Sequence, residues 1–212
     1  MDTWRDIRAA LPGHPRWQLV GFAAGCAQRL VPMAAGLGGP AVADTADAGL
    51  ALAWAAAEGR DVQPKLGGEI GRLMHVMEAS PDVGLEILAT HALNLTVFAL
   101  EAAAQPTPTD RAQAAGVGAI DLLGQVDFLL AGPPARNLVF IEPDEGMEEP
   151  PGPLATKEIE AQRTSIALLE MGDRPHRRAI AAVQQLSRAR AAELSEVLPD
   201  FARRWAADAS QA

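Results

Sequence analysis

Apolar side chains between Arg16 and Ala35 recur at steps of three and four residues, which is the period of an α-helix. Much of the apolar content of the chain is alanine, the strongest helix former, while aromatic residues make up only 4% and tyrosine is absent. No segment alternates apolar and polar residues as a half-buried strand does. The sequence therefore predicts an all-α protein, a single-domain bundle of about seven to nine helices.

The helix predicted over 16–35 is amphipathic, with Gln18, Gln28 and Arg29 on its outward face. Its inward face carries the apolar residues Leu19, Val20, Phe22, Ala23, Cys26, Ala27, Leu30 and Val31. A buried cysteine on such a face behaves as a small apolar residue, and burial raises the pKa of its thiol. We therefore expect Cys26 to be chemically inert.

Capping residues, glycine and proline divide the rest of the chain into further helices. Asp44 or Thr45, Ser80 and Thr107 are predicted helix caps, and Pro199 separates a short terminal helix from a long one. Residues 132–153, rich in proline and acid, are predicted to form a loop within one domain that spans residues 1–212. The predicted helices end near 11, 35, 59, 79, 104, 131, 171 and 197.

The net charge of −9 argues against nucleic-acid binding and against anionic membranes, because both repel an acidic surface. A basic protein partner is attracted to such a surface. The single cysteine excludes an intrachain disulfide and suits the cytoplasm. We expect no signal peptide, and no charge-free apolar stretch reaches the ~18 residues of a membrane span.

The chain lacks the usual motifs of catalysis and ligand binding. Its four histidines, His14, His75, His91 and His176, do not have metal-ligand spacing. It has neither a GxSxG elbow nor a P-loop. We therefore expect no catalytic residue, no metal ion and no cofactor. His91 lies on the apolar stripe of its helix, where a hydrogen-bonded core histidine is commoner than a ligand.

Two charged segments are candidates for binding. Residues 142–149 hold five acids without a base, which favours either a solvated loop or a surface that meets a basic partner. The run 174–178, RPHRR, favours pairing with the protein's own acids over binding of an external anion. The acidic candidates are Glu142, Asp144, Glu145, Glu148 and Glu149.

Several stretches resemble known bacterial proteins. The residues Trp17, Gln18, Val20, Phe22, Ala24, Arg29 and Pro32 resemble the opening signature of the YjaG-like family, whose members are helical and have no established activity. Glu158, Glu160 and Gln162, followed by Ile166, Leu168 and Leu169, resemble its acidic segment, and the run ASPDVGLEILATHAL is similar to its middle helix. The runs CAQRLVP and LALAWAAAEGR resemble immunity proteins of polymorphic-toxin systems. These resemblances imply an intracellular all-α bundle without a catalytic set.

Gln162 shares a helical face with the apolar residues Ile159, Ile166 and Leu169, so we expect it to be buried. A buried amide needs hydrogen-bond partners, and we expect Gln162 to bridge two helices together with Arg29 or Glu158. The same polar residues would line an interhelical pocket if the protein bound a small molecule.

Three functional hypotheses follow. The first is a non-catalytic protein-binding module, such as an immunity protein that neutralises a basic toxin, with a homodimer possible. The second is an enzyme or small-ligand protein whose interhelical pocket contains His91, Glu158 and Gln162. The third is a bundle that binds no ligand.

Overall fold

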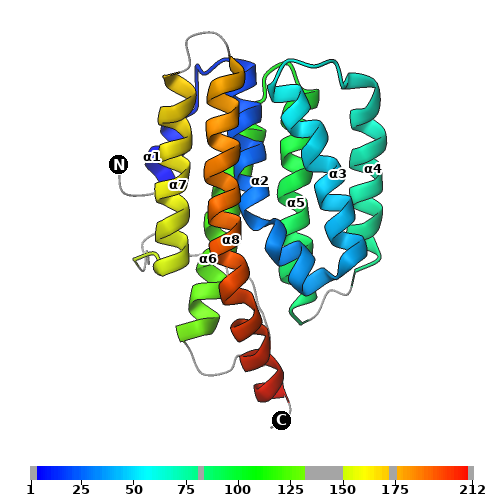
Figure 1. Ribbon diagram of the computed structural model, residues 1–212, viewed down its shortest axis with the longest axis vertical. Coiled ribbons are helices and arrows are strands. Elements are labelled where there is room, and N and C mark those ends of the chain that lie inside the picture. Colours follow the sequence, from blue (N-terminus) through cyan, green and yellow to red (C-terminus); the bar gives the residue numbers. More distant parts are fainter. Residues whose placement is uncertain (1–3, 81–83, 132–149, 172–175, 210–212) are drawn as a thin grey trace.

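Helix α2, Arg16–Gly38, runs through the middle of the computed structural model and contacts five other helices (Figure 1). Helices α3, α4 and α5 lie on one side of α2, and α1, α6, α7 and α8 lie on the other. The structure describes residues 4–80, 84–131, 150–171 and 176–209. A helix with neighbours on all sides must be apolar around its whole circumference, and nearly every side chain from Gln18 to Ala34 is buried.

The described residues form eight α-helices and no strand, which confirms the predicted all-α bundle. The core is one connected cluster to which all eight helices contribute side chains. The helices are α1 Trp4–Ala10, α2 Arg16–Gly38, α3 Pro40–Ala57, α4 Gln63–Glu78, α5 Glu86–Ala104, α6 Thr109–Ala131, α7 Pro153–Glu170 and α8 His176–Ala209.

Two predicted helix starts were wrong. Helix α3 begins at Pro40, because Gly39 adopts a φ of 83° and turns the chain directly after α2. Thr45 therefore lies inside the helix and donates to the Ala41 carbonyl rather than acting as a cap. Ser80 does not cap α5 either, because its hydroxyl donates to the Val76 carbonyl in α4.

The predicted break at Pro199 was also wrong. Helix α8 continues through this residue to Ala209, although proline removes one backbone hydrogen bond. Leu198 and Phe201 on either side of Pro199 are 5% and 2% exposed, so packing against the body keeps the chain helical there. The last turns of α8 extend past the ends of the neighbouring helices (Figure 1).

Helices α5 and α6 have the length and mean hydropathy, 1.4 and 1.5, of a helix that crosses a membrane. Core helices of soluble bundles meet the same criterion, and 61% of the apolar window of α5 is buried inside the protein. Both helices carry acids, among them Glu101 and Asp121, in agreement with the absence of a charge-free apolar stretch. Only 39% of the window of α6 is buried, so part of this apolar helix faces outward.

Asp127 of α6 holds the N-terminus of α7. Its carboxylate accepts hydrogen bonds from the backbone amides of Leu154 and Ala155 at 2.9–3.0 Å. These amides have no partner within their own helix, so the carboxylate caps α7 from a different helix. A Cβ atom at Gly152 would lie 2.5 Å from the Asp127 side chain, which explains why glycine precedes α7.

We predict that Asp127→Ala lowers the free energy of unfolding by about 1 to 2 kcal/mol, because it leaves buried helix-terminal amides without an acceptor. Urea denaturation followed by circular dichroism measures this loss. The exposed Asp47→Ala is the control and leaves stability nearly unchanged. Equal effects of the two substitutions would refute the capping role of Asp127.

Candidate functional site

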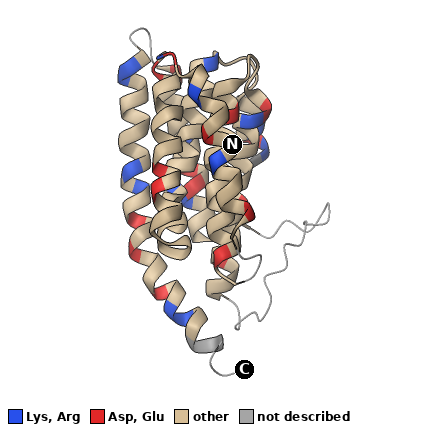
Figure 2. Cartoon of the chain, turned by 90° about the vertical axis from the view of Figure 1, so that its right-hand side faces the viewer, with Lys and Arg blue, Asp and Glu red and all other residues tan. Residues whose placement is uncertain are grey.

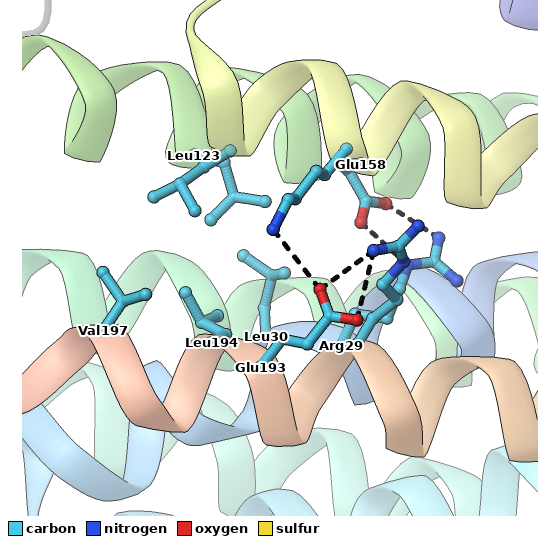
Figure 3. Close-up of a pocket in the computed structure, with 10 residues that line it drawn as sticks. Arg29, Leu30, Leu123, Glu158, Glu193, Leu194 and Val197 are labelled. Carbon is cyan, nitrogen blue, oxygen red and sulfur yellow. Dashed lines mark hydrogen bonds and ion pairs between the residues drawn. The ribbon is translucent and has the colours of Figure 1, made fainter.

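Arg29 of α2 and Glu158 of α7 form an ion pair inside the protein, with side chains 1% and 2% exposed. Arg29 Nε donates to Glu158 Oε2 at 2.8 Å, and its terminal nitrogen donates to Oε1 at 2.7 Å. This two-point contact is the strongest geometry that a guanidinium and a carboxylate can adopt. Figure 3 shows the pair in the space between α7 and α8.

Other polar side chains complete the surroundings of this pair. Gln162 donates from Nε2 to Glu158 Oε1 at 2.9 Å and to the Gly116 carbonyl of α6 at 2.8 Å. The second terminal nitrogen of Arg29 lies 3.4 Å from the Ser165 hydroxyl and 3.2 Å from the Ser187 hydroxyl. The polar cluster thus joins four helices and consists of Cys26, Arg29, Glu158, Gln162, Ser165 and Ser187.

Gly25 makes room for this cluster. A Cβ atom at this position would lie 3.1 Å from Val183 and 3.2 Å from both the Arg29 guanidinium and the Ser187 hydroxyl. A side chain here would force α8 away from α2 or displace the guanidinium. The glycine therefore allows the close contact between α2 and α8 that encloses Arg29.

The electrostatics of the cluster oppose proton transfer. Burial alone would lower the pKa of Arg29, but the neighbouring Glu158 carboxylate outweighs it and raises the pKa above its usual value. Burial raises the pKa of Cys26 from 9.0 to about 12, despite the opposing effect of Arg29. The prediction of a buried Cys26 with a raised thiol pKa is therefore confirmed, and this thiol is not a nucleophile at neutral pH.

A cavity of about 50 Å³ lies beside the ion pair. Its walls are mostly apolar, and Lys157, Arg190 and Glu193 stand at its rim, where Glu193 pairs with both cations (Figure 3). Small-molecule sites usually measure about 300 Å³ or more, so this cavity suits a few water molecules rather than an organic substrate. Its lining residues are Arg29, Leu30, Leu123, Leu154, Lys157, Glu158, Arg190, Glu193, Leu194 and Val197.

The structure brings together three of the residues singled out in the sequence. Gln162 is buried and bridges α7 and α6 with Glu158 as a partner, as predicted. Arg29 was placed on the outward face of its helix and also named as a partner for the buried Gln162; the outward placement was wrong, because α7 and α8 cover that side of α2, and the buried polar role is confirmed. Gln18 is also buried, and its amide donates to the Leu169 carbonyl of α7 at 2.8 Å, whereas Gln28 is half-buried.

His91 does not belong to this site. It is half-buried on α5, where burial lowers its pKa, and it is not among the residues that line the cavity. The predicted acidic segment 142–149 and residues 174 and 175 of the basic run lie outside the described residues. His176, the middle residue of that run and the first residue of α8, packs against Trp17 with tilted rings whose centroids are 4.2 Å apart.

Ser165 and Ser187 were missed in the sequence, although both stand at core positions of their helices. Ser187 lies four residues after the buried Val183, and Ser165 lies three residues after Gln162. A serine that interrupts an apolar stripe is a signal for a buried polar partner. Nothing in the sequence specified that this partner would be Arg29.

Groups of three or more histidine, cysteine or acidic side chains that could hold a metal ion do not occur within residues 4–80, 84–131, 150–171 and 176–209. No family model matches the chain, and comparisons with curated proteins and with solved structures also found no match.

We predict that Glu158→Gln lowers the free energy of unfolding by about 3 to 5 kcal/mol, because it leaves a buried guanidinium without a countercharge. The double variant Arg29→Met with Glu158→Leu removes both charges and recovers most of that loss. Denaturant titration of Arg29→Met, of Glu158→Leu and of the double variant measures the coupling energy. Additive effects of the two positions would contradict a coupled buried pair.

The pH dependence of stability tests the state of Cys26. The native protein keeps its thiol proton up to a pKa of about 12, whereas the unfolded chain loses it near 9.0. Unfolding therefore releases a proton between pH 9.0 and about 12. As a result, the free energy of unfolding falls by up to ~1.4 kcal/mol for each pH unit in this range.

Cys26→Ala should show a shallower decline between pH 9.0 and 12 than the wild type, measured by denaturant titration. The difference between the two proteins isolates the contribution of the Cys26 thiol. Parallel curves would mean that the native thiol ionises normally.

Proposed function

We propose that this protein is a non-catalytic protein-binding module of the cytoplasm. The observation that carries the proposal is that the charges of the polar cluster are satisfied by one another inside the bundle. Arg29 and Glu158 are nearly inaccessible, and the cavity beside them is too small for an organic substrate. Because Arg29 and Glu158 are occupied by each other inside the bundle, they are not available for chemistry on a ligand. We therefore place the binding function on the surface of the protein.

The described surface offers an acidic end to a basic partner. Residues 30–59 and 73–110 contain neither lysine nor arginine. Asp44, Asp47, Glu78 and Glu86 are exposed where α3 begins, α4 ends and α5 begins, at the lower right of Figure 1. Figure 2, in which the right-hand side of Figure 1 faces the viewer, shows charged residues of both signs along the helices, so the lack of lysine and arginine in these two ranges does not extend over the whole surface. The negative potential of this acidic end attracts and orients a basic protein.

The more specific form of the proposal is an immunity protein that neutralises a toxin. It is supported by the sequence resemblance of residues 17–32 and 50–60 to such proteins, together with the acidic charge. An immunity protein acts by occupying the surface of its toxin and needs no catalytic set, in agreement with the internal use of Arg29 and Glu158.

The alternative is a small-ligand protein, for which the cavity between α7 and α8 is the favourable observation. The volume of about 50 Å³ makes this the second choice, because it is below the ~150 Å³ of a cavity that holds benzene.

The test combines capture with genetics. The tagged protein is purified from its native host, and its partners are identified by mass spectrometry, with the products of adjacent genes examined first. The triple variant Asp44→Asn, Asp47→Asn and Glu86→Gln should lower the association rate about tenfold at low salt and much less at high salt. Variants of the exposed acids Glu160 and Glu170, on the other side of the bundle, serve as the control.

For the immunity form, expression of the captured partner alone should arrest growth, and coexpression of the wild-type protein should restore it. A host deletion that never sensitises the cell to any neighbouring gene product would contradict immunity. Failure to capture any protein would contradict the broader binding proposal.

A further inference from the structure

One face of α6, which mixes small, apolar and charged residues, is only partly covered by the rest of the bundle. Residues three and four apart along this helix share a face, and the residues of this set are half-buried or exposed. Phe128 is 66% exposed, which is unusual for a large apolar side chain, and the apolar window of α6 is only 39% buried. The α6 face consists of Arg111, Ala114, Val117, Gly118, Asp121, Gln125 and Phe128.

We propose that the α6 face binds the same face of a second copy of this chain, with the two α6 helices antiparallel and Asp121 of each copy paired with Arg111 of the other. The exposed ring of Phe128 and the opposite charges of Arg111 and Asp121 are the features of the α6 face that a second copy can contact. A two-fold dimer uses the same patch on both copies, so the patch must complement itself.

The charges of the α6 face meet this requirement. Asp121 has no ion-pair partner within the described part of the chain, although neighbouring protein groups reduce its solvation and raise its pKa. Arg111 contacts Glu101 through Nε at 3.0 Å, and its side chain is 39% exposed. The guanidinium has five donors, so its terminal nitrogens can bind a second carboxylate.

The spacing of the charges also fits. In an antiparallel pair, facing residues have a constant sum of their numbers, and Arg111 opposite Asp121 gives 111 + 121 = 232. The same sum places Ala114 opposite Gly118, because 114 + 118 = 232. Small residues therefore meet near the crossing point, although Gly118 lies at the edge of the face, where a Cβ atom would be 3.0 Å from Leu95 of α5.

The end of the α6 face fits as well. In the same register Thr109, the first residue of α6, lies opposite position 123, so Phe128 extends past the start of α6 of the second copy. There Ala104 and Pro106 are exposed at the turn between α5 and α6. An exposed phenyl ring can thus contact exposed apolar surface of the second copy.

A second copy suits this face better than a basic partner does. Two chains of net charge −9 repel each other through most of their surface. The α6 face carries one cation and one anion, so it is neutral and brings two copies together with the least repulsion. The acidic end formed by α3, α4 and α5 remains accessible to a basic protein, and dimerisation is thus independent of the proposed function.

Sedimentation velocity of the full chain across a hundredfold concentration range tests the proposal. The wild type should change from monomer to dimer, and Asp121→Arg should weaken the dimer by about tenfold or more, because Arg111 then faces a like charge. The double variant Arg111→Asp with Asp121→Arg should recover at least part of the affinity. Circular dichroism confirms that each variant is folded.

A second pair of variants separates the α6 face from general apolar exposure. Phe128→Ser should weaken the dimer, whereas Met171→Ser, which replaces a side chain 73% exposed at the end of α7, should not. A wild type that stays monomeric at every concentration would overturn the proposal. So would equal effects of the two serine variants, or a monomer that cosediments with lipid vesicles through Phe128.

Discussion

The Arg29–Glu158 pair is the interaction around which this bundle is organised. Two charges withdrawn from water cost several kcal/mol each, and only a close, fully hydrogen-bonded geometry offsets that cost. The two-point contact, Gln162 and the serines provide this geometry. Because the groups come from α2, α7 and α8, and Gln162 reaches the α6 backbone, the relative positions of four helices are specified by one cluster.

This arrangement also limits what the protein can do. A guanidinium held on a carboxylate, with its thiol neighbour protonated, is a poor source of general acid, general base or nucleophile. Residues 17–32 and 158–169, the stretches expected from the sequence to follow a family signature, supply every member of the cluster except Ser187. Their recognisable residues thus describe how the helices pack.

The sequence was sufficient for the fold class, because helical period and alanine content leave little room for strands. It also predicted the buried role of Gln162, since a polar residue within an apolar stripe needs partners wherever it lies. Periodicity could not show that α2 is surrounded by other helices, so Gln18 was assigned to solvent and Arg29 was placed on the outward face even though it was also a candidate partner for Gln162. A one-dimensional pattern identifies an apolar face but not what covers the opposite face.

Long-range contacts account for the remaining differences. Asp127 caps a helix that starts 26 residues later, and no local motif announces such a cap. Pro199 is a strong local break signal, yet packing of Leu198 and Phe201 overrides it. Cavities and exposed faces such as that of α6 arise only when the helices are assembled.

The most direct test of the central claim is hydrogen exchange at the Arg29 Nε–H group, followed by nuclear magnetic resonance. If the guanidinium is enclosed and paired with Glu158, this proton exchanges only when the whole protein unfolds, at the rate of the slowest core amides. Exchange as fast as that of exposed arginines such as Arg203 would contradict the account, because it would place Arg29 in contact with solvent in the native state.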